Sequence, residues 1–202
     1  MKQPRIPPII PDIIQTALSA CDGTVFDRRE ACPSCGGELS GYDRKKKQFA
    51  ILMEDDKKRP INVFVKRFFC RTCRAVWFAD EPFYPDTRIG SPVVDLCVTL
   101  ATTMPFTRAA AYLSQMGVIV DRGSVRNYVR RGFLDIPGAD MFGIRLPLSI
   151  ISLFEIAART GEGSPVTGAE ALAACGFPSA RRAAPHRPVP EEEGDQRDKE
   201  DN

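Results

Sequence analysis

Four cysteines, arranged as two Cys-x-x-Cys pairs, are the side chains of this sequence best suited to chemistry. The pairs are Cys32 with Cys35 and Cys70 with Cys73, and 34 residues lie between them. Two thiolates separated by two residues can bind one metal ion from a single tight turn, and two such turns complete a tetrahedral Zn²⁺ site with no open position. The spacing therefore predicts one structural zinc ion per chain, which would stabilise the fold and activate no water.

Two alternatives to a metal site are four unrelated buried thiols and a redox pair. A redox Cys-x-x-Cys needs only one pair, placed at the start of a helix in a βαβ unit. Neither pair has such surroundings, and both have the spacing of metal ligands, so metal binding is favoured.

The residues around the two pairs predict a zinc ribbon over residues 24–80. Gly36 and Gly37 follow the first pair, and small residues let backbone amides turn toward the sulfurs. The β-branched and aromatic run 61–69 suits a strand, and residues 49–52 suit its partner across a polar turn at 54–60. One departure is Arg74, which stands where ribbon knuckles usually carry glycine. The second knuckle is therefore expected to be strained or differently turned.

A second candidate site is a predicted helix from Asp121 to about Phe133. Apolar side chains recur along it at helical spacing and would face inward, while arginines spaced by four residues would line another face. Arginine binds guanine edges and phosphates, and asparagine pairs with adenine, so this face suits a recognition helix in the DNA major groove. The alternative is a solvated basic face, although acidic partners normally accompany such arginines. The candidate DNA-binding residues here are Arg122, Arg126, Asn127, Arg130 and Arg131.

Basic residues also cluster in the predicted hairpin. Lys45, Lys46 and Lys47 follow Arg44, and such a run can add phosphate contacts that strengthen binding without reading sequence. The alternative is a solvated hairpin tip, because acidic residues lie close by in the sequence.

The remaining elements must position these residues, and the sequence predicts an α+β fold. A small β zinc ribbon is followed by an all-α helix-turn-helix bundle and a disordered acidic tail. The apolar helix 146–158 is either buried or a homodimer contact. The expected segments are an N-terminal extension with a short helix at 1–23, the ribbon at 24–80, the helix-turn-helix at 91–134, a C-terminal helical segment at 144–184 and the tail at 185–202.

Charge is divided unevenly along the chain. Residues 191–202 carry seven acids and two bases, which is a net charge of −5. Because the whole chain has a net charge of +2, residues 1–190 have a net charge of +7. A basic body is compatible with a polyanionic partner. The most apolar run is shorter than the roughly 20 residues that cross a bilayer, and an odd cysteine count beside a metal site fits a reducing compartment. We therefore expect no membrane partner and a cytoplasmic location.

The motifs together resemble those of a known family. The segment CPSCGG…FFCRTCRAVW, followed by TRAAAYLSQMGVIVDRGSVRNYVRR, resembles the N-terminal part of prokaryotic insertion-sequence transposases. The resemblance covers residues 31–133. In that family the ribbon and the helix-turn-helix together bind the terminal DNA of the element, which implies the zinc ligands and DNA-reading helix named above. The resemblance also implies that Ser124 lies on the DNA-reading helix.

The resemblance does not extend to a catalytic domain. Such transposases carry three acidic metal ligands on an RNase-H-like sheet, and only about 70 residues follow Phe133 here. Two-metal chemistry needs carboxylates that hold both ions about 4 Å apart, so we expect no enzyme activity. The sequence predicts a zinc-stabilised protein that binds double-stranded DNA, either transposase-like and non-catalytic or a transcriptional regulator. The alternative is a zinc-ribbon module that docks on a protein, for example of the transcription machinery, without sequence-specific DNA contact.

Overall fold

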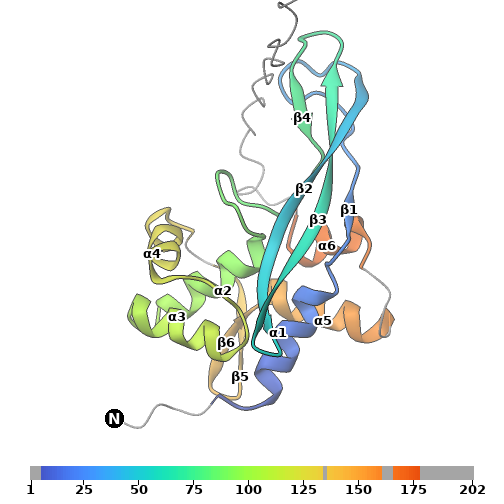
Figure 1. Cartoon of the computed structure of the whole chain (residues 1–202). Helices are drawn as coiled ribbons and strands as arrows, with labels where there is room; N and C mark the ends of the chain where they lie inside the picture. Colours follow the sequence, from blue (N-terminus) through green and yellow to red (C-terminus); the bar gives the residue numbers. More distant parts are fainter. Residues whose placement is uncertain (1–5, 134–135, 161–165, 178–202) are drawn as a thin grey trace, which may run out of the picture.

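A long antiparallel hairpin forms the axis of the molecule. The computed structural model describes residues 6–133, 136–160 and 166–177. Strands β2 (Leu39–Glu54) and β3 (Lys57–Cys70) form the hairpin, and helices gather around the end that carries its turn (Figure 1). The short strands β1 (Val25–Phe26) and β4 (Val76–Phe78) pair with β3, the first in parallel and the second antiparallel. The mixed α+β class expected from the sequence is confirmed.

The hairpin turn is tighter than the sequence predicted. Asp55 and Asp56 both take left-handed backbone conformations, with φ of 47° and 58°. Two consecutive left-handed residues match the right-handed twist of the flanking strands, so β3 can begin at Lys57 directly after the turn. The basic run Arg44–Lys47 consequently lies in the middle of β2, opposite residues 63–66, and not at a hairpin tip.

The turn end of the hairpin is part of the main hydrophobic core. Phe49 and Ile61 are fully buried there. The amide of Met53 donates to the carbonyl of Gly117 at 2.8 Å, and the amide of Ile119 donates to the carbonyl of Ile51 at 2.9 Å. One buried cluster includes side chains of α1, the hairpin and the helices that follow. The core therefore runs across the segment boundaries predicted from the sequence.

Three consecutive short helices follow a proline-containing linker. They are α2 (Ser91–Ala101), α3 (Phe106–Gln115) and α4 (Arg122–Arg130). Residues 91–100 of α2 are all buried, so this helix is enclosed by its neighbours on every side. Gly117 ends α3 with φ of 78°, and the Asp121 side chain accepts from the Ser124 amide at the start of α4. The start of α4 at Asp121 was predicted and is confirmed.

Helix α1 (Ile9–Ser19) packs mainly against α5 (Leu148–Thr160). Its buried residues Ile10 and Ile14 belong to the same core as Ile150 and Leu153 of α5. The apolar face of α5, on which the homodimer expectation depended, is thus covered within the chain. Helix α6 (Gly168–Ala174) begins with a capping box between Thr167 and Glu170.

A second small hairpin, which the sequence did not predict, precedes α5. Strands β5 (Gly138–Met141) and β6 (Ile144–Pro147) pair across a two-residue turn in which Phe142 and Gly143 are left-handed. The C-terminal helical segment expected over 144–184 therefore begins with a strand, β6, and its helices α5 and α6 follow. The predicted tail 185–202 lies outside the described residues. Among the described residues, no helix is both long enough and apolar enough to span a bilayer.

Candidate metal centre and nucleic-acid interface

The four predicted cysteine ligands come together at the end of the hairpin opposite its turn. All four Sγ atoms lie within 4.8 Å of one another. Cys32 Sγ is 3.5 Å from Cys73 Sγ, and Cys35 Sγ is 3.5 Å from Cys70 Sγ. A tetrahedral Zn²⁺ with bonds of about 2.3 Å places its sulfur ligands roughly 3.8 Å apart. The cluster therefore has the size of a four-sulfur metal site, and one structural metal ion fits it.

The two knuckles have the same backbone geometry. The amide of Gly36 donates to the Cys32 carbonyl at 2.8 Å, and the amide of Arg74 donates to the Cys70 carbonyl at 2.9 Å. Gly36 is left-handed with φ of 69°, and Arg74 has φ of 60°. The second knuckle is thus not differently turned. Arg74 takes the conformation that favours glycine, which costs an L-residue about 1–2 kcal/mol.

The thiols of the cluster differ in acidity. The amide of Cys73 lowers the pKa of Cys70 to about 6, despite some loss of hydration. The Gly37 amide lowers the pKa of Cys35, but the sulfur of Cys70, loss of hydration and the other sulfurs outweigh it and raise that pKa to about 12. Cys70 therefore forms a thiolate most readily, and a metal ion must displace a proton from Cys35 at neutral pH.

A small cluster of buried side chains supports the metal centre. Cys32, Cys70 and Trp77 are nearly inaccessible and form a group separate from the main core, whereas Cys35 and Cys73 are exposed. This side of the molecule has little apolar material of its own. A metal ion bound by the four sulfurs would therefore add to the β2–β3 pairing that holds the two knuckles together.

An ion pair further along the hairpin joins its two strands. Arg67 on β3 is buried, and its Nε and Nη2 both donate to the carboxylate of Asp43 on β2, the first at 2.6 Å. These bonds lower the pKa of the Asp43 carboxyl. The sequence gave no sign of this pair, because a β-bulge between Gly41 and Arg44 sets which residues face each other.

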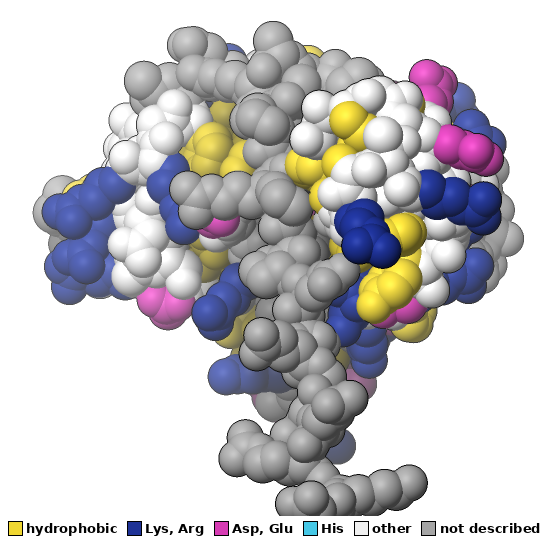
Figure 2. Space-filling model, turned by 90° about the horizontal axis from the view of Figure 1, so that it is seen from above, with side chains coloured by type: hydrophobic (Ala, Val, Ile, Leu, Met, Phe, Trp, Pro, Cys, Tyr) yellow, Lys and Arg dark blue, Asp and Glu magenta, His cyan; other side chains and the backbone are white. Residues whose placement is uncertain are grey.

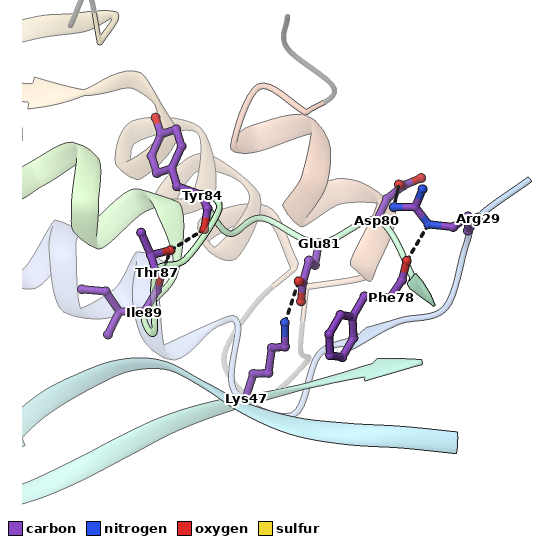
Figure 3. Close-up of polar contacts among 8 residues, drawn as sticks. All are labelled: Arg29, Lys47, Phe78, Asp80, Glu81, Tyr84, Thr87 and Ile89. Carbon is purple, nitrogen blue, oxygen red and sulfur yellow. Dashed lines mark hydrogen bonds and ion pairs between the residues drawn. The ribbon is translucent and has the colours of Figure 1, made fainter. Parts of the chain in front are cut away.

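Lys47, predicted as a phosphate contact, is engaged inside the molecule. Its Nζ donates to Glu81 Oε1 at 2.6 Å and lies 3.8 Å from the centre of the Phe78 ring (Figure 3). The Glu81 side chain is fully inaccessible, and burial raises its pKa. The ammonium group compensates a buried carboxylate, so we leave Lys47 out of the proposed DNA interface.

The three predicted lysines lie on different faces of β2. Because side chains alternate across a strand, Lys46 stands opposite the exposed Phe64, while Lys45 and Lys47 stand opposite the buried Val65 and Val63. Lys46 is exposed, and Lys45 is half-buried. Of this run, Lys46 is best placed for a phosphate contact.

Helix α4 separates an apolar face from a basic one. Val125 is buried and Tyr128 is half-buried, whereas Arg122, Arg126 and Arg130 are exposed. No carboxylate in the described ranges forms an ion pair with these three arginines. Asn127 is exposed beside them. Seen from above, lysine and arginine side chains lie on several parts of this face of the molecule (Figure 2).

Two of the predicted α4 residues have structural contacts. The Ser124 hydroxyl donates to Asp121 Oδ2 at 2.6 Å, within the cap of the helix. Nη1 of Arg131 donates to the carbonyls of Pro85 and Asp86, which fastens the linker to the end of α4. These residues position the helix, which leaves Arg122, Arg126, Asn127 and Arg130 as its outward-facing set.

No protein-family model, curated protein or solved structure matches the chain. The resemblance to insertion-sequence transposases therefore stays a hypothesis from the sequence.

Proposed function

We propose that this chain is a zinc-stabilised protein that binds double-stranded DNA through α4, without catalysis. The observation that carries the proposal is the outward face of α4, where three arginines and Asn127 are exposed without acidic partners in the described ranges. The helix itself contains no acidic residue. The guanidinium groups of the three arginines can donate to guanine edges and to phosphates, and the side-chain amide of Asn127 can pair with an adenine edge.

The packing of α4 supports its use as a rigid recognition helix. It contacts both α2 and α3, and Val125 and Tyr128 join the core. The connection from α3 to α4 is hydrogen-bonded to β2 through Gly117 and Ile119. We propose that α3 and α4 act as a helix-turn-helix and that the cysteine cluster binds Zn²⁺ to complete a ribbon. Lys46 would add a phosphate contact from the hairpin.

Salt-dependent binding to a pool of random duplexes tests the proposal. Fluorescence anisotropy on the zinc-loaded full chain should detect binding that weakens steeply with salt. Arg126→Ala combined with Asn127→Ala should lower affinity by at least about tenfold, since each good base contact is worth about 1–3 kcal/mol.

Arg159→Ala is the matched control, because Arg159 is also exposed but lies in α5, away from α4 (Figure 1). It should bind DNA like the unmodified chain. An unchanged affinity in the double variant would refute the role of α4. Cleavage of the duplex with added divalent ions would refute the absence of catalysis.

Docking on another protein is the second candidate function. Exposed aromatic side chains on the hairpin favour it, namely Tyr42 at 58% and Phe64 at 37% exposure. Such residues are common in protein interfaces. If Phe64→Ala abolished capture of a purified partner while the α4 variants left that capture unchanged, docking would replace DNA binding as the function of this chain.

A further inference from the structure

A cavity of about 500 Å³ lies on the helical part of the molecule, away from the cysteine cluster. Its walls come from the C-terminal half of α2, from α3, from the β5–β6 hairpin and from the chain just before α1. This volume is within the range of about 300–1,000 Å³ typical of small-molecule sites. Neither the metal centre nor the face of α4 uses these residues.

One side of the cavity is apolar and incompletely covered. Leu100, Met104 and Ile144 line it, and Phe142 at the β5–β6 turn completes it. Phe142 is 63% exposed, the largest exposure of the big apolar side chains in the described ranges. It stands in a left-handed turn with Gly143, which holds its ring out from the hairpin. A ligand with an apolar body would remove this ring from water.

Two arginines, Arg108 and Arg145, also line the cavity. Arg145 lies 3.6 Å from Asp140, its cross-strand neighbour, so these two charges offset each other. The guanidinium of Arg108 lies 5.6 Å from the centre of the Tyr112 ring, and no described carboxylate comes within ion-pair distance of it. One cation therefore remains uncompensated beside an apolar wall.

A buried hydroxyl group gives an independent indication of a ligand. Thr99 lines the cavity, is 5% exposed, and its Oγ1 has no hydrogen-bond partner among the described atoms. Buried hydroxyls almost always have a partner, so an unpaired one in a cavity wall requires an explanation. A polar atom of a bound molecule would supply the missing hydrogen-bond partner of Thr99 Oγ1.

We propose that this cavity binds a small organic anion with an aromatic or aliphatic body, of the carboxylic acid class. The anionic group would pair with Arg108, the body would cover Leu100 and Phe142, and a polar atom would reach Thr99. A carboxylate suits Arg108 because its two oxygens accept two parallel guanidinium hydrogen bonds.

Calorimetric titration of the full chain with 1-naphthoate tests the proposal, with 1-naphthamide as a neutral probe of nearly the same shape. Naphthoate should bind, and naphthamide should bind about tenfold more weakly, because a charge-assisted hydrogen bond is exchanged for a neutral one. Arg108→Gln should weaken naphthoate binding by about the same factor and leave naphthamide binding unchanged. Phe142→Ser should weaken both probes.

Arg122→Gln is the control, since it removes an exposed arginine outside the cavity. It should not change naphthoate binding, and this result does not depend on whether the chain binds DNA. Equal binding of the two probes, or unaltered naphthoate binding by Arg108→Gln, would overturn the assignment of an anion site. Failure of naphthoate to bind at millimolar concentration would overturn it as well.

Discussion

At the scale of single residues, the two knuckles offer a direct measurement of backbone strain. Arg74 and Gly36 occupy equivalent left-handed positions. Arg74→Gly should stabilise the zinc-loaded protein by about 0.5–1 kcal/mol, because relief of the left-handed penalty exceeds the added chain entropy of glycine. Gly36→Ala should destabilise it by about 1 kcal/mol, although the added Cβ meets no atom within 4 Å. Urea unfolding would measure both, and equal effects of the same sign would contradict the argument.

Neighbouring lysines on β2 provide a second comparison. Lys47→Ala should destabilise the fold by about 3 kcal/mol, because it removes the ammonium group that pairs with the inaccessible Glu81 carboxylate. Lys46→Ala should leave stability nearly unchanged, since Lys46 lies on the exposed face of the same strand. Thermal unfolding of both variants separates the two roles. A Lys47→Ala protein as stable as Lys46→Ala would show that the ion pair is unimportant.

At the scale of elements, the beginning of α4 depends on one carboxylate. The hydroxyl of Ser124, and to a smaller extent its backbone amide, hydrogen-bond to Asp121 and lower the pKa of its carboxyl below the usual value. Because the pKa of Asp121 is lower in the folded protein than in the unfolded chain, its ionised carboxylate stabilises the fold at pH values above the unfolded-state pKa near 3.8. This stabilisation is lost as the pH falls through the folded-state pKa. Acid should therefore loosen α4 at its first turn.

Asp121→Ala should have the same effect at neutral pH and cost about 1 kcal/mol of helix stability. Faster hydrogen exchange of the α4 amides would report it. Asp27→Ala, at an exposed position before the first knuckle, should leave those amides unchanged. Protection of α4 that is unaffected by Asp121→Ala would mean that packing against α2 and α3 alone fixes the helix.

Local signals explain which elements the sequence predicts well. The cysteine spacing and Asp121 act within a few residues of their own positions, and the structure has the cysteine cluster and the start of α4 as predicted. The β5–β6 hairpin escaped prediction because its strands are four residues each and its turn uses Phe142 beside glycine. Contacts such as Lys47 with Glu81 depend on chain segments 34 residues apart, which no local pattern specifies.

At the scale of the whole molecule, the two ends of the hairpin are packed by different clusters of buried side chains. The main core joins the helices to the turn end of the hairpin, while the knuckle end has a small cluster around Trp77. We therefore expect the stability of the knuckle end to depend on a bound metal ion. The thiol pKa values set how strongly a metal binds, since Cys35, with a pKa of about 12, must lose a proton. Metal affinity should accordingly rise with pH through neutrality.

Chelation should unfold one end of the molecule and spare the other. Trp77 is the sole tryptophan of the sequence and is 4% exposed beside Cys70. Removal of the metal with a strong chelator should shift its fluorescence to longer wavelength as water reaches the indole. Helical circular dichroism should remain, because none of the helices contributes to the Trp77 cluster. Cys73→Ser should reproduce the fluorescence of the chelated protein, whereas loss of helix together with the shift would mean that the metal holds the entire fold together.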